Sequence, residues 1–216
     1  MLNTIKSYSL FIFSTIILGL GICLVTLAEL GTTAITSPPY VMSQFIPITF
    51  GMLTMCMNTL YVFLQFILLR SDFPKTQYLQ LLVGPVLGVA IDSWSYLIYH
   101  IPTYYSIQLF MVITGCVVIA WSIVLQLKAN VVNNPAEGIV KVIAMKTNKP
   151  FGQIKLLFDV FLVIMALIIS VSVLGMIYGV REGTVISAIL VGPLVKIMQN
   201  PVKKRVRHLE SPSLWR

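Results

Sequence analysis

The stretch that decides the fold runs from Ser93 to Leu127 and reads SWSYLIYHIPTYYSIQLFMVITGCVVIAWSIVLQL. It contains no Asp, Glu, Lys or Arg, and a second uncharged stretch extends from Leu30 to Leu69. A soluble domain carries about 25% charged residues. This chain carries 10%, with 57% hydrophobic residues and a mean hydropathy of +0.91. The composition predicts an all-α membrane protein and excludes a secreted disulfide scaffold and a cytosolic enzyme.

Six segments are long and apolar enough, or nearly so, to be transmembrane helices. They are residues 7–28, 46–69, 79–101, 105–127, 152–175 and 184–199. The first has an alternative interpretation as a signal peptide, because Lys6 precedes it and Thr26-Leu27-Ala28 resembles a cleavage site. The repeat described below argues against cleavage.

The basic residues predict the orientation of these spans. With six spans and the N-terminus inside, fourteen of the fifteen Lys and Arg residues face the cytoplasm, and Arg181 alone lies outside. This is the positive-inside pattern, so both termini are expected in the cytoplasm. The net charge of +8 therefore reports membrane orientation and gives no reason to expect nucleic acid as a partner. The basic tail, residues 201–216, is expected to contact anionic lipid headgroups.

An internal repeat relates the two halves of the chain. Phe50-Gly51 followed by Asn58 recurs 101 residues later as Phe151-Gly152 followed by Asp159. Leu82 to Pro85 recurs as Leu190 to Pro193 at a spacing of 108. Three spans in each half invert the second half relative to the first. The sequence thus predicts an inverted 3+3 repeat, with residues 1–101 as the first unit and 105–200 as the second.

The two long linkers differ in charge as inverted loops should. Residues 28–44 contain Glu29 and no basic residue, whereas residues 128–149 contain four lysines. In both, Ser, Thr or Asn followed by Pro indicates the start of a short helix. Two interpretations remain open: half-helices that enter the membrane from opposite sides, or surface loops with interfacial helices.

Ionisable and amide groups at membrane depth are the candidate solute or ion ligands, because burying them without a function is costly. Asp92 lies in mid-span without a local cation and is the leading candidate. Asp159 has Lys155 one helical turn away, so an ion pair near the membrane boundary is the alternative role. The full candidate set is Asp92, Asn58, Asp159, Lys155, Asn133, Glu137 and Glu29.

No enzyme signature occurs in the sequence. It lacks a Walker-type loop, an H-E-x-x-H motif, a G-x-S-x-G motif and a Rossmann glycine string. With two histidines and no thiol cluster, neither a metal site nor a cofactor is expected.

Several motifs together resemble the YczE/YitT-like family of bacterial inner-membrane proteins. The resemblance extends from about Gly19 to Pro201. It rests on Thr36-Ser37-Pro38, Phe50-Gly51 with Asn58, Gly84 to Asp92, Asn133 to Gly138, Phe151-Gly152 with Lys155 and Asp159, and Arg181 to Thr184. Ala136 departs from a glycine in the family-like pattern. The resemblance implies a multi-pass protein of the bacterial inner membrane and transfers no site residue.

These observations favour a secondary transporter or permease of a small polar or anionic solute. The alternatives are a non-transporting accessory membrane protein and the substrate-capture subunit of an ATP-driven importer. The expected partners are the bilayer, the solute and, as an open alternative, a second copy of the chain in a homodimer.

Overall fold

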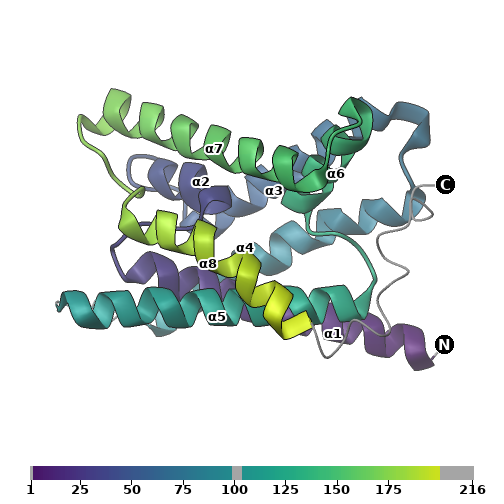
Figure 1. The fold of residues 1–216 in the computed structure, drawn as a ribbon, viewed down its shortest axis with the longest axis horizontal. Coiled ribbons are helices and arrows are strands. Elements are labelled where there is room, and N and C mark those ends of the chain that lie inside the picture. Colours follow the sequence, from purple (N-terminus) through teal and green to yellow (C-terminus); the bar gives the residue numbers. More distant parts are fainter. Residues whose placement is uncertain (1, 99–103, 200–216) are drawn as a thin grey trace.

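The computed structural model describes residues 2–98 and 104–199, and every regular element within them is a helix (Figure 1). The expected contact between the basic tail and lipid headgroups falls on residues outside the described part. Six long helices are accompanied by short ones in the connections. The long helices are α1 (Leu2–Leu27), α3 (Phe50–Leu69), α4 (Gln80–Leu97), α5 (Tyr105–Ala129), α7 (Phe151–Ile169) and α8 (Glu182–Gln199). The short elements are η1 (Ala34–Thr36), α2 (Ser37–Met42), η2 (Arg70–Asp72), η3 (Lys75–Leu79), α6 (Pro135–Thr147) and the π-helical turn η4 (Ser170–Leu174).

Five of the long helices are long and apolar enough to cross a membrane, which indicates a membrane protein. They are α1, α3 with η2, α5, α7 with η4, and α8. The segment predicted as the third span, residues 79–101, forms α4 but is not one of the five. Polar residues such as Gln80 and Asp92 lower its hydropathy, and the last residues of the predicted span lie outside the described part.

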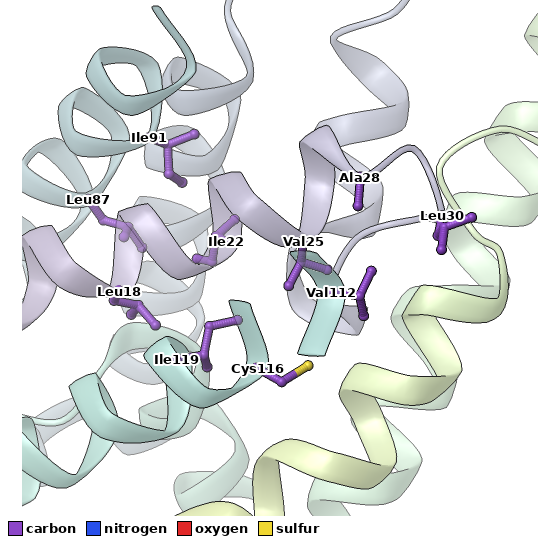
Figure 2. Close-up of a cluster of buried hydrophobic side chains, with 10 residues drawn as sticks. All are labelled: Leu18, Ile22, Val25, Ala28, Leu30, Leu87, Ile91, Val112, Cys116 and Ile119. Atoms are coloured by element: carbon purple, nitrogen blue, oxygen red, sulfur yellow. The ribbon is translucent and has the colours of Figure 1, made fainter. Parts of the chain in front are cut away.

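Helices α1 and α5 pack antiparallel against each other and approach closely where they cross. A Cβ built on Gly21 would lie 2.6 Å from Ile119 Cγ1, and one on Gly115 would lie 2.6 Å from Val25 Cγ2. Figure 2 shows the core that this contact organises, with Ile22 and Val25 near Ile119 and Cys116. Small residues permit such close packing between apolar helices.

Two further helices flank this central pair. Helix α4 lies along α1, where a Cβ on Gly19 would meet Ala90 Cβ at 2.8 Å, and α8 packs on α5. Leu87 and Ile91 extend the same apolar core from α4 (Figure 2). Pro193 lies inside α8, which bends partway along its length (Figure 1).

Much of both long linkers packs against the long helices. Whether they are half-helices within the membrane or interfacial helices stays a prediction. Helix α2 packs on α3 and α7, and α6 packs on the same two helices. The backbone of the first linker has partners inside the protein, because the Thr32 amide donates to the Gly179 carbonyl at 3.2 Å and the Leu30 carbonyl accepts from the Gly183 amide at 2.7 Å. The hydroxyl groups of the linker bond to one another. Thr32 contacts Thr26 at 2.8 Å and Thr36 at 2.9 Å, and Thr36 contacts Thr33 at 2.7 Å.

Enlarging Gly115 should destabilise the crossing of α1 and α5. We expect Gly115→Val to lower the free energy of unfolding by about 1–3 kcal/mol, because the added atoms overlap Val25 and the Gly21 carbonyl. Thermal unfolding of the purified protein in detergent measures the effect. Gly152→Ala is the matched control, since a Cβ at Gly152 meets nothing within 4 Å. Equal stability of the two variants would contradict the close crossing.

Candidate functional site

A cavity of about 380 Å³ lies between the two halves of the chain. Apolar side chains from α1, α4 and α5 form one part of its wall, including Leu18, Leu87 and Ile119. The polar part of the wall comes from α3, α6, α7 and the first linker. A mostly apolar pocket with a few convergent polar groups is typical of a small-molecule site.

Four of the predicted site residues line this cavity. Asn58 reaches it from α3, Lys155 and Asp159 from α7, and Glu137 from α6. Asn58 is buried, with 3% of its surface exposed. The structure therefore brings together the repeat-related residues Asn58 and Asp159, which are far apart in the sequence.

Lys155 and Asp159 form the ion pair that their spacing predicts. Lys155 Nζ donates to Asp159 Oδ1 across one turn of α7. Both side chains are part-buried, with 25% and 22% exposed, and both line the cavity. The ammonium group of Lys155 is thus paired with a carboxylate on its own helix.

Glu137 is held in the cavity wall by the start of α6. Asn134 is the N-cap of this helix, and its side chain accepts a hydrogen bond from the Ala136 amide at 3.3 Å. The Asn134-Pro135 signal predicted in the sequence is confirmed. Glu137 lies in the first turn, where the helix dipole favours a carboxylate.

The surroundings of Glu137 shift the pKa of its carboxyl group upward. Burial raises the pKa of Glu137, the nearby charge of Lys155 opposes the rise, and that of Asp159 adds to it. Within the part of the chain that the structure describes, no hydrogen bond or ion pair is formed by the Glu137 side chain. This carboxyl group is the uncompensated acid of the cavity.

Tyr61 is a cavity residue that the sequence analysis missed. Its side chain is 3% exposed and lines the cavity, and its ring lies edge-on to Phe158 with a centroid distance of 5.6 Å. Its hydroxyl group is buried without a hydrogen-bond partner among the described residues. A tyrosine in an apolar helix carries no signal in the sequence, because the same residue serves equally as core.

A buried glutamine network, also missed, fixes the start of α6. Gln65 Nε2 donates to Gln80 Oε1 at 2.9 Å and to the Pro135 carbonyl at 3.1 Å, and Gln80 in turn donates to Gln77. A Cβ on Gly138 would lie 2.6 Å from Gln65 Oε1, so α6 rests directly on this amide. The network positions Glu137 without touching the cavity. Gln65 is uncharged, so the pattern of ionisable residues in the sequence does not indicate it.

Residues 5–200 match a family of unknown function (DUF6198). The chain belongs to this family. No curated protein and no solved structure matches the chain. The family match covers both halves, including the whole cavity, and assigns it no activity. The resemblance to the YczE/YitT-like family stays a prediction.

Three predicted site residues of this family member lie away from the cavity lining. Glu29 is exposed and adopts a left-handed conformation (φ 56°) just beyond the end of α1. Asn133 precedes the cavity residue Asn134 and does not line the cavity itself. The third is Asp92, the leading candidate from sequence.

Asp92 closes the N-terminus of α3. Its carboxylate accepts hydrogen bonds from Thr49 Oγ1 at 2.6 Å and from the Gly51 amide at 2.8 Å. Thr49 is itself the N-cap of α3 and accepts from the Met52 amide. Asp92 thus connects α4 to α3. Its hydrogen-bond partners are an uncharged hydroxyl group and a backbone amide.

Removing the Asp92 carboxylate should cost stability. We expect Asp92→Ala to lower the free energy of unfolding by about 1–3 kcal/mol, because two hydrogen bonds to a charged group are lost at the start of α3. Thermal unfolding in detergent is the measurement. Asp72→Ala, which removes an exposed carboxylate between α3 and α4, is the control and should leave stability unchanged. Unchanged stability of Asp92→Ala would contradict the capping role.

Proposed function

We propose that the chain spans a bacterial inner membrane six times as an inverted 3+3 repeat with both termini in the cytoplasm. Geometry at equivalent positions supports the repeat. Helices α3 and α7 begin 101 residues apart, at Phe50 and Phe151. Glu29 and Asn130, also 101 residues apart, both adopt left-handed conformations after α1 and α5.

The short helices supply a second argument for the repeat. Helix α2 of the first half packs on α7 of the second half, and α6 of the second half packs on α3 of the first. They lie at opposite ends of the molecule (Figure 1). A two-fold relation between inverted halves produces this exchange.

Helix α4 completes the six spans in this proposal. Its 18 residues extend about 27 Å at the α-helical rise, close to the thickness of a bilayer core. Its polar side chains have partners inside the protein. Gln80 bonds within the glutamine network, Asp92 bonds to α3, and Ser95 contacts Cys23 of α1 at 3.5 Å.

We further propose that the protein is a secondary transporter of a small polar or anionic solute and is not an enzyme. The observation that carries this proposal is the cavity between the halves, with Asn58 and Asp159 at repeat-related positions in its wall. Transporters built from inverted repeats place their substrate at such an interface, where unwound backbone and half-helices meet. The buried linkers provide both.

Transport by the purified protein tests the proposal. Proteoliposomes are given an isotope-labelled bacterial metabolite extract under a proton or sodium gradient, and accumulated solutes are identified by mass spectrometry. We expect at least one solute to accumulate, and Asn58→Leu to reduce its uptake at least tenfold because the cavity loses a hydrogen-bonding group. Phe63→Leu, on the exposed face of α3, is the control and should transport like the wild type.

Two outcomes favour the alternatives. Uptake that requires a copurified ATPase pair indicates a substrate-capture subunit. A normal phenotype in cells after substitution of Asn58, Lys155 and Asp159, with no uptake in proteoliposomes, indicates an accessory protein.

A further inference from the structure

With Glu137 ionised, the cavity wall carries two negative charges and one positive charge. Its ionisable side chains are Glu137, Lys155 and Asp159, together with the hydroxyl of Tyr61. Lys155 is bonded to Asp159 on the same helix, and its charge also acts on Glu137, which forms no ion pair of its own among the described residues. Glu137 is part-buried, and an unpaired carboxylate in a mostly apolar cavity is costly, so this site is completed either by a proton or by a cation.

An anionic ligand does not fit this wall. The N-terminal turn of α6, which could otherwise attract an anion, already holds the Glu137 carboxyl group. An incoming anion would also lie beside Asp159. The ammonium of Lys155 is engaged by that carboxylate and cannot offset both acids.

A second feature independently indicates a ligand with polar atoms. The Tyr61 hydroxyl is buried, lines the cavity and has no hydrogen-bond partner in the described residues. Buried hydroxyl groups are rarely left unpaired. Asn58 lies one turn before it on α3 and offers an amide on the same side of the cavity.

We propose that the cavity binds a small organic cation whose ammonium group pairs with Glu137 and whose polar atoms bond to Tyr61 and Asn58. This inference rests on the cavity of the proposed function and replaces an anionic solute with a cationic or zwitterionic one. Proton and cation compete for the same carboxylate. No charge is then left unpaired in either state.

The groups facing Glu137 determine the expected pH dependence. The charges of Lys155 and Asp159 on α7 act on Glu137, and Lys141 lies one turn further along α6. The cavity wall also contains Asn58, Tyr61 and Thr36. Burial raises the pKa of Glu137, and the carboxyl group must ionise before it can pair with an ammonium ion. Affinity for a cation should therefore rise as the pH increases through this raised pKa.

Ligand-induced stabilisation tests the charge preference without any transport assay, because a ligand of the folded state raises its melting temperature. The probes are butylammonium, ethanolammonium and agmatine, with butyrate as the anion matched in size to butylammonium. We expect the ammonium probes to raise the melting temperature by a few degrees, more strongly at pH 8 than at pH 5, and butyrate to have no effect.

Two variants connect the response to the cavity. Glu137→Gln should fold and lose the ammonium response, whereas Glu182→Gln, which alters an exposed carboxylate paired with Arg181, should keep it. Stabilisation by butyrate, an unchanged response in Glu137→Gln, or no response to any ammonium probe overturns the proposal. Amine binding without uptake in proteoliposomes would instead overturn the proposed transport.

A second, independent inference comes from two repeat-related contacts between helices. The first seam is the contact of α3 with α4, and the second seam is the corresponding contact of α7 with α8. Helices α3 and α4 are tightly packed: a Cβ on Gly51 would lie 2.1 Å from the Gly88 carbonyl oxygen, and one on Gly84 would lie 3.3 Å from the Met55 carbonyl oxygen. The equivalent glycines of the second half are Gly152 and Gly192. Neither has any atom within 4 Å of its Cβ position.

The second seam is open in the structure. Helix α7 packs on α2, η1 and α6, and has no comparable contact with α8 in the described chain. Gly152, Leu156 and Gly192 are exposed. The cavity extends between these helices and is lined by Lys155 on one side and by Gly192 and Val195 on the other.

We infer that the structure is the inward-facing state and that α7 and α8 are its cytoplasmic gate. The open seam involves the start of α7 and the second half of α8, the end that the basic residues assign to the cytoplasm. In the outward-facing state, α8 packs against α7, with Gly192 beside Leu156 and Asp159. This contact is the repeat equivalent of the present one, in which Gly84 of α4 lies beside Met55 and Asn58 of α3. The seam of α3 and α4 then opens.

A cross-link tests this closure. In a chain whose three native cysteines are replaced by serine, we expect Leu156→Cys with Gly192→Cys to be joined by a short thiol-specific cross-linker in native membranes. The pair Leu157→Cys with Gly192→Cys is the control, because Leu157 lies one residue further around α7. No cross-link at 156 and 192, or equal cross-linking in the control, overturns the inference. The result does not depend on transport activity.

Discussion

The exclusion of water from a bilayer core is the constraint on which this structure depends. Any backbone or side-chain polar group placed there must find its partner inside the protein. In the membrane arrangement that we propose, the first linker meets this demand through the hydroxyl series of Thr26, Thr32, Thr36 and Thr33, and the second through the amide network of Gln65, Gln80 and Gln77. Those internal partners are what allow two non-spanning helices to lie buried between the long ones.

The same constraint separates structural polar residues from candidate ligands. Asp92 and Gln80 are polar groups in a long apolar helix, and both are hydrogen-bonded to other parts of the chain. Glu137 and the Tyr61 hydroxyl face the cavity and lack such partners among the described residues. Polar residues with complete hydrogen bonding stabilise the fold. Polar residues left incomplete beside a cavity indicate where a ligand binds.

The features that could be predicted from the sequence are those that depend on residues close together in the chain. The helical nature of the apolar segments, the Asn134 cap and the pairing of Lys155 with Asp159 depend on neighbours within one or two turns, and the structure confirms them. The role of Asp92 depends on Thr49 and Gly51, more than forty residues away. That contact requires the register between α3 and α4, which hydropathy does not supply. Asp92 does not line the cavity and Glu137 does, so Glu137 is the residue that we propose as a ligand.

The departures from the repeat explain why one conformation can be favoured over its mirror. At a spacing of 108, Gly88 corresponds to Lys196, and at a spacing of 101, Thr49 corresponds to Pro150. The first seam thus has a backbone contact between Gly51 and Gly88 and a capped helix start, and the second seam has neither. A closed α7–α8 seam would have to accommodate the Lys196 side chain at the position where the first seam has Gly88, which has no side chain. The proposed gate is therefore expected to open more readily at the end where α7 begins.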